Sequence, residues 1–120
     1  MAESKKRVVM LVRRSPLNTI MGAEALRQSV GLTVADLDLT VVLLDAAAWL
    51  AVPLSPEVIG GGDIKKHLDT LPLLKARVVV ESQSLERYGI DRDRVRKDIE
   101  VIDSQEVVSE ITGAQAVIAF

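Results

Sequence analysis

Five short apolar runs, rich in β-branched residues, recur along the chain with helical patterns between them. They cover residues 7–12, 39–44, 77–80, 99–102 and 116–120. The longer runs are continuous rather than alternating in polarity, which is typical of strands buried on both faces of a parallel sheet. None contains proline or glycine, so each can lie within a sheet. The pattern predicts a three-layer α/β/α sandwich with a mainly parallel five-stranded sheet.

Helical patterns fill the gaps between these runs. We expect helices over residues 18–31, 63–71 and 103–113, and a single helical turn over 84–88. Gly31 and Pro72 are expected to end the first two helices, and Gly89 to close the turn in a left-handed conformation. Asp103 and Glu106 have the spacing of a capping box at the start of the last helix.

Composition narrows the classes of function. A chain of 120 residues fits one domain, residues 1–120, and its net charge of −2 gives no reason to expect direct nucleic-acid binding. Three aromatic residues, Trp49, Tyr88 and Phe120, are too few for a base-stacking platform. The chain has no cysteine and one histidine, His67, so we expect no disulfide, no thiolate chemistry, no metal site and no cofactor.

The expected cellular location is inferred from the beginning of the sequence. Residues 1–7 are polar and basic, and the apolar run that follows stops at Arg13. This run is too short for a signal-peptide core and far too short to span a bilayer. We expect a cytoplasmic protein with no membrane partner.

Residues that follow the strands form the candidate binding pocket, because ligands of open parallel sheets bind beyond the carboxyl ends of the strands. The candidates are Arg13, Arg14, Asn18, Asp45, Glu81, Ser82 and Ser84. The arginines beside a helix N-terminus suit an anion. The alternative is that Asn18 caps the helix and the arginines pair with acidic neighbours or with a partner subunit. Asp45 alone is more often a cap or a member of an ion pair. The serines lack an obvious base, which argues against a serine hydrolase.

A small apolar segment after the second strand is the candidate interface. It contains Trp49, Leu50 and Val52. Tryptophan is a frequent interface hot spot, and exposed apolar patches often mark contacts. The alternative is that Trp49 covers the edge of the sheet.

Two further features of the sequence have simple structural interpretations. The glycines at 60–62 indicate a flexible hinge or a tight turn rather than a phosphate loop. The cluster of Arg92, Arg94, Arg96 and Lys97 is expected to be a solvated face.

Four pieces of the sequence carry a family resemblance. The first comprises Pro16, Thr19, Gly22, Glu24 and Leu26, the second is Asp45 with Trp49, the third runs from Val80 through Ser84 to Ile90, and the fourth is 115–120. In this order and spacing the chain resembles DsrE/DsrF/TusC-like sulfur-relay proteins, and is most similar to the TusC/DsrF branch. The resemblance implies a DsrE/F-like, Rossmann-like α/β/α sandwich that assembles into dimers, trimers or hexamers, often with sibling subunits.

The resemblance also implies a role in passing persulfide sulfur. In catalytic members the acceptor cysteine follows the third strand, at the position that matches Glu81 here. A carboxylate cannot carry a persulfide, so this chain departs from the family pattern at the decisive residue. The expected function is therefore a non-catalytic subunit, in a homo-oligomer or beside cysteine-bearing siblings. One alternative is a homo-oligomeric domain that binds a small anion or nucleotide through Arg13, Arg14, Asn18 and Ser84. Another is an enzyme with Asp45, Glu81 or His67 as acid or base.

Overall fold

Five parallel strands form a single sheet in the order β4-β3-β2-β1-β5. The computed structural model describes residues 6–13, 21–33, 37–53 and 63–119. The strands are β1 (Lys6–Val12), β2 (Leu37–Leu43), β3 (Arg77–Glu81), β4 (Glu100–Ile102) and β5 (Ala116–Ala119). All four neighbouring pairs run parallel. The predicted strands and the parallel sheet are confirmed.

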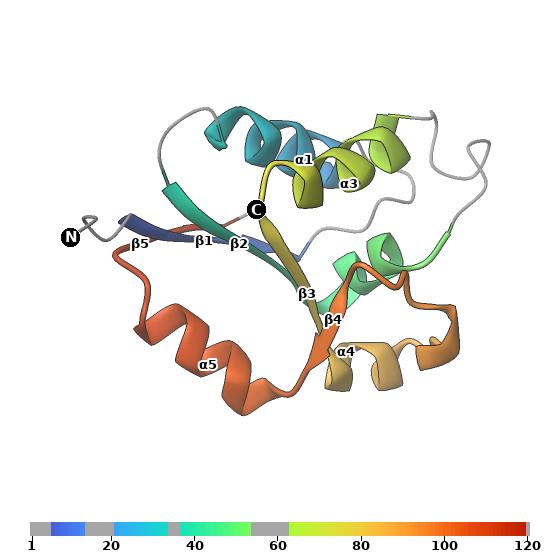
Figure 1. Ribbon diagram of the computed structural model, residues 1–120. Coiled ribbons are helices and arrows are strands. Elements are labelled where there is room, and N and C mark those ends of the chain that lie inside the picture. Colours follow the sequence, from blue (N-terminus) through green and yellow to red (C-terminus); the bar gives the residue numbers. More distant parts are fainter. Residues whose placement is uncertain (1–5, 14–20, 34–36, 54–62, 120) are drawn as a thin grey trace.

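Helices cover both faces of this sheet. They are α1 (Met21–Leu32), α3 (Asp63–Leu73), α4 (Ser82–Arg87) and α5 (Ser104–Thr112), with short 3₁₀ helices η1 (Asp45–Ala51) and η2 (Arg92–Arg94). Figure 1 shows α1 and α3 together over one face and α5 under the other. The segments η1 and α4 follow β2 and β3, so they lie at the carboxyl ends of the strands (Figure 1). The molecule is the three-layer α/β/α sandwich that the sequence predicts.

The core has two parts, one on each side of the sheet. Alternate residues of β1 divide between them: Val8 and Met10 belong to the larger part with Leu26 of α1, whereas Val9 packs in the smaller part with Val107 of α5. Because side chains alternate across a strand, burial on both sides requires consecutive apolar residues. This requirement explains the unbroken apolar runs in the sequence.

Two helix ends differ from the expectation. Gly31 lies inside α1, which continues to Leu32, and Pro72 lies inside the last turn of α3. Proline removes one hydrogen-bond donor, but the turn still closes because the amide of Leu74 donates to the carbonyl of Thr70 over 3.2 Å. Two other expectations are confirmed: Gly89 has a φ of 65°, and the capping box at the start of α5 is present.

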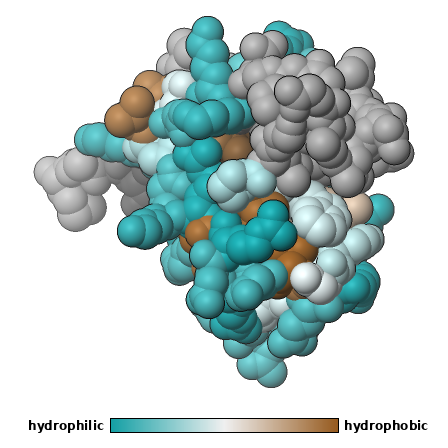
Figure 2. Space-filling model, turned by 90° about the vertical axis from the view of Figure 1, so that its right-hand side faces the viewer, coloured by the Kyte–Doolittle hydropathy of each residue, from teal (hydrophilic) through white to brown (hydrophobic). Residues whose placement is uncertain are grey.

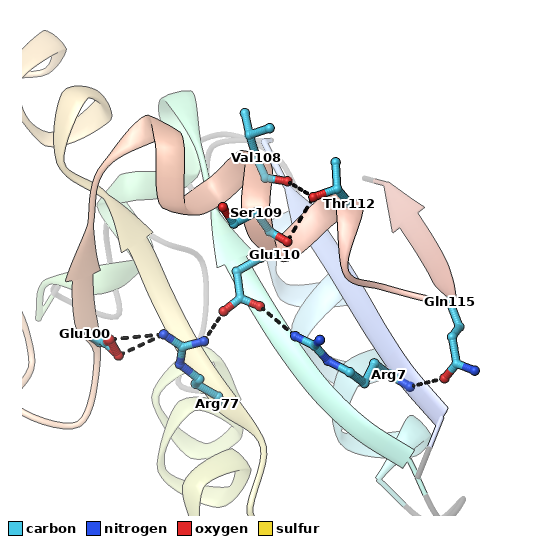
Figure 3. Close-up of polar contacts among 8 residues, drawn as sticks. All are labelled: Arg7, Arg77, Glu100, Val108, Ser109, Glu110, Thr112 and Gln115. Carbon is cyan, nitrogen blue, oxygen red and sulfur yellow. Dashed lines mark hydrogen bonds and ion pairs between the residues drawn. The ribbon is translucent and has the colours of Figure 1, made fainter. Parts of the chain in front are cut away.

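Ion pairs connect α5 to the amino ends of the strands, the ends away from η1 and α4 (Figure 3). The mostly buried Glu110 lies between two guanidinium groups. It pairs with Arg77 at the start of β3 and, over 3.5 Å, with Arg7 near the start of β1. Arg77 also donates to both carboxylate oxygens of Glu100 at 3.0 Å. This chain of ion pairs links α5 to β1, β3 and β4.

Among the helices that the structure describes, none combines the length and the apolar character needed to cross a membrane.

Candidate functional site

Glu81 is the centre of a polar cluster beyond the carboxyl ends of the strands. It is the last residue of β3, and both of its carboxylate oxygens are occupied. The hydroxyl of Ser84 donates to Oε1 over 2.6 Å, and the hydroxyl of Ser104 donates to Oε2 over 2.9 Å. Ser84 lies in α4 and Ser104 begins α5. The carboxylate therefore joins the helices that follow β3 and β4.

Ser84 extends this cluster to the end of β2. Its side chain is fully buried, and its oxygen accepts a hydrogen bond of 2.8 Å from the backbone amide of Asp45. Asp45 has a φ of 51°, a left-handed conformation that aspartate tolerates better than most residues. Its carboxylate accepts from Arg87 over 2.6 Å. The ion-pair alternative for Asp45 is thus the one observed.

The amide groups at the start of α5 are held by the protein itself. The amide of Ser104 donates to Oε1 of Gln83 over 3.1 Å, and the amide of Glu106 donates to Asp103 over 2.8 Å. Gln83 also accepts from the hydroxyl of Ser82 over 2.9 Å. Helix N-termini bind anions through such amides, so an anion at this helix must displace Gln83 or Asp103.

The structure brings together part of the predicted pocket. Asp45, Glu81 and Ser84 share one network, and Ser82 joins it through Gln83. Arg13 is exposed just beyond the end of β1. Arg14 and Asn18 lie outside the described residues, as do the glycines at 60–62. The anion or nucleotide site that depends on Arg14 and Asn18 stays a prediction.

Three members of the network were not predicted: Gln83, Arg87 and Ser104. A signal for Ser104 exists in the sequence, because it follows the fourth strand almost directly and strand ends of a parallel sheet share one edge. Gln83 has the same signal, because it follows the third strand between Ser82 and Ser84. Arg87 gives no comparable signal, since its contact depends on how α4 packs beside η1, which no short motif encodes.

The candidate interface segment lies in and directly after η1, with Trp49 and Leu50 inside this 3₁₀ helix and Val52 next to its last residue. Leu50 and Val52 are buried within this chain, so both side chains contribute to its own core. Trp49 is half-buried and packs against that core. Figure 2 looks at the molecule from the side that carries η1, α4 and η2, and there hydrophobic residues appear as small areas among hydrophilic ones. Of the three predicted residues, only Trp49 is left with side-chain surface for a partner.

The basic cluster is a solvated face except at Arg96. Arg96 has only 18% of its side chain exposed, and it pairs with Asp69 of α3 and with Asp98 over 3.1 Å. Hydrogen bonding to Asp98 raises the pKa of Arg96. Hydrogen bonds from Lys65 and then from Arg96 lower the pKa of Asp69. Arg96 therefore ties the segment before β4 to α3.

The chemistry available to the cluster is limited. Ser84 is fully buried and hydrogen-bonded on both sides, so its oxygen cannot reach a substrate without opening of the network. In residues 6–13, 21–33, 37–53 and 63–119, no three His, Asp or Glu side chains are grouped so as to hold a metal ion. The arrangement positions helices around Glu81 and presents no activated nucleophile.

An open parallel sheet with helices on both faces, and polar residues beyond the carboxyl ends of its strands, defines a Rossmann-like α/β protein. The model of the DsrE/DsrF-like family matches residues 6–120, and the chain belongs to this family. The DsrE/DsrF-like family expected from the sequence is thereby confirmed, and the TusC/DsrF branch stays a prediction.

Two solved structures share the fold. The ychN protein from E. coli has a TM-score of 0.82 and 19% sequence identity, with 96% of this chain and 99% of that chain covered. A protein of unknown function from Methanobacterium thermoautotrophicum has a TM-score of 0.74, 19% identity and the same coverage. A comparison with curated proteins found no match. At this level of identity the two structures show a common fold.

Proposed function

We propose that this chain is a non-catalytic interaction subunit of an intracellular sulfur-relay-type assembly, of the TusC/DsrF type. Glu81 carries the proposal. The resemblance to the family puts the acceptor cysteine of catalytic members at the end of the third strand, and here that position holds a carboxylate. Both oxygens of this carboxylate are hydrogen-bonded to serines that open or lie in the adjoining helices. A residue used in this way stabilises the site rather than reacting in it.

The absence of sulfur nucleophiles supports the same proposal. Persulfide transfer requires a thiolate on the acceptor, and the sequence contains no cysteine. The acceptor sulfur must then belong to another subunit, a DsrE-like sibling that has a cysteine after its third strand. The contribution of this chain is to bind and position that sibling.

The test is to purify the tagged chain from its own cells under native conditions and to label sulfane sulfur in the isolated complex. We expect a cysteine-bearing DsrE-like sibling at a fixed ratio, with the label on the sibling. Recovery of this chain alone, or only with copies of itself, would overturn the proposal.

A pair of cysteine variants tests the position itself. Glu81→Cys places a thiol at the end of β3, and Glu86→Cys places a matched thiol on the exposed part of α4. Offered a persulfide donor from the same complex, Glu81→Cys should take up sulfur and Glu86→Cys should not. Equal labelling of both variants would mean that the end of β3 has no special relation to the relay.

A further inference from the structure

The chain between α4 and β4 forms a strap, residues 91–98, which includes η2 and runs past η1 (Figure 1). Buried isoleucines flank the strap at both ends, Ile90 before it and Ile99 after it. No residue of the strap itself is buried. Its one apolar side chain, Val95, is partly covered where it packs against the larger part of the core. Few buried apolar contacts are typical of a segment with low local stability.

The short hydrogen-bonded turns of the strap are internal to it. The amide of Arg94 donates to the carbonyl of Asp91 over 3.0 Å, and the amide of Val95 donates to that of Arg92 over 3.1 Å. The carboxylate of Asp91 accepts from the amide of Asp93 over 3.0 Å. These bonds shape η2, but they do not join the strap to the rest of the protein.

Arg96 fastens the strap to the body of the protein. Among the described residues, the hydrogen bonds and ion pairs from the strap to another helix or strand all come from Arg96. Its amide donates to the carbonyl of Ala51, the last residue of η1, over 2.9 Å, and its guanidinium pairs with Asp69 of α3. A surface hollow of about 380 Å³ borders Arg96, Lys97 and Asp98. The fastening therefore relies on Arg96 rather than on close packing.

We propose that the strap is a conformational latch. Residues 91–98 open as one unit between the fixed ends Ile90 and Ile99, with Arg96 as the single fastening, while the sheet stays folded. Opening frees the carbonyl of Ala51, two residues after Trp49 in η1. Trp49 is the residue of the candidate interface that has side-chain surface left for a partner. The state of the strap thus sets the shape of the surface beside Trp49.

Hydrogen exchange of the whole chain, followed residue by residue by NMR, tests the latch. Asp69→Ala removes the partner of Arg96 on α3. We expect exchange of the amides of Arg94, Val95 and Arg96 to accelerate by one common factor, roughly threefold to tenfold, while the amides of β2 keep their rates. Lys65→Ala is the control, because it removes the other ion-pair partner of Asp69 and leaves the latch intact.

Three results of this comparison overturn the proposal. Acceleration confined to Arg96 means that the strap does not open as a unit. Acceleration shared with β2 means that Asp69→Ala lowers the stability of the whole fold instead of releasing a local segment. Equal exchange of the strap in Asp69→Ala and Lys65→Ala means that the ion pair with Arg96 does not hold it.

Trypsin supplies a second readout, because the strap contains four residues after which it cleaves: Arg92, Arg94, Arg96 and Lys97. Proteolysis of a transiently opened segment follows the population of the open form. Cleavage within the strap should be severalfold faster in Asp69→Ala than in the native chain, and unchanged in Lys65→Ala. The exposed Arg27 of α1 is the internal reference, and mass spectrometry of the fragments locates each cut. Equal cleavage of the strap in all three chains rejects the latch. Neither readout needs a partner or sulfur, so the outcome is independent of the sulfur-relay proposal.

Discussion

The hydroxyl of Ser84 donates a hydrogen bond of 2.6 Å to Oε1 of Glu81 while its oxygen accepts from the amide of Asp45 over 2.8 Å. Through this one buried hydroxyl, the end of β2 and the end of β3 are linked. Buried polar groups are costly when a partner is removed. The cluster around Glu81 is therefore expected to contribute to stability, and its members should be energetically coupled.

Replacing Ser84 with alanine removes both bonds. We expect the free energy of unfolding to fall by about 1–3 kcal/mol, because the Asp45 amide and the Glu81 carboxylate each lose a partner. Urea denaturation measures this change. The exposed Ser109 of α5 provides the control, and Ser109→Ala should stay within about 0.5 kcal/mol of the native chain. Equal effects of the two substitutions would contradict a special role for Ser84.

Glu81 and Ser104 should be coupled across the strand ends. In a double-mutant cycle of Glu81→Ala and Ser104→Ala, we expect an interaction free energy of about 0.5–2 kcal/mol, because each substitution alone removes the same hydrogen bond. The comparison cycle pairs Glu81→Ala with Thr112→Ala at the far end of α5. These two changes should be additive to within about 0.5 kcal/mol. Additivity in both cycles would show that the 2.9 Å contact carries no energy.

Glu110 is expected to contribute to stability through its two arginines. Glu110→Gln removes the charge between Arg7 and Arg77, and we expect a loss of about 1–2 kcal/mol in the free energy of unfolding. Glu86→Gln, on the exposed part of α4, is the matched control and should change stability very little. If Glu110→Gln lowers the free energy of unfolding no more than Glu86→Gln does, water replaces the carboxylate as a partner of Arg7 and Arg77 without loss of stability.

Two glycines should respond in opposite ways to the same substitution. Gly89 has a φ of 65°, which alanine adopts only with strain, so Gly89→Ala should destabilise the chain by about 1 kcal/mol. Gly31 lies in α1, and an added Cβ there meets no atom within 4 Å. Gly31→Ala should therefore stabilise the chain by about 0.5 kcal/mol through helix propensity. Thermal melting of both variants tests the signs, and a shared sign would be inconsistent with one of the two backbone conformations.

Glu24 should titrate at unusually low pH. A hydrogen bond from Arg27 is the main cause that lowers the pKa of Glu24 from 4.5 to about 2. Because the folded-state pKa is the lower one, the stabilisation is complete above about pH 4.5 and is lost as the pH falls toward 2. NMR titration of the Glu24 carboxyl carbon measures the midpoint. Arg27→Gln should raise this midpoint toward the ordinary value, and an unchanged midpoint would exclude Arg27 as the cause.

The sequence predicts those parts of the fold that depend on local physics. Consecutive apolar residues around Val8 and Val41 indicate strands because both faces of a buried strand need them. The capping box of Asp103 and Glu106 needs only a spacing of three residues. Gly89 follows a helical turn and indicates a left-handed backbone conformation, because glycine has no Cβ to oppose it. All three features were predictable from a few neighbouring residues.

The rest depends on contacts between distant segments. The 3₁₀ helix η1 has no periodic pattern, and its first residue is held by Ser84, 39 positions away. Ser104 becomes a partner of Glu81 only because β4 lies beside β3. The order of the strands in the sheet cannot be predicted from any single segment of the sequence. Leu50 and Val52 are buried for the same reason. Their apolar character was evident, but the sequence did not reveal which surface would cover them.

The pairing of β1 with β5 has a consequence for how the protein is made. Gln115 holds Arg7 through two hydrogen bonds of 2.8 Å, and the two residues are 108 positions apart. During synthesis the first strand leaves the ribosome long before its outer neighbour exists, and contacts of such separation form slowly. Until then the outer edge of β1 stays open to other chains. A chain that stops before residue 116 lacks β5 and leaves this edge of β1 unpaired, so we expect that form to aggregate most readily.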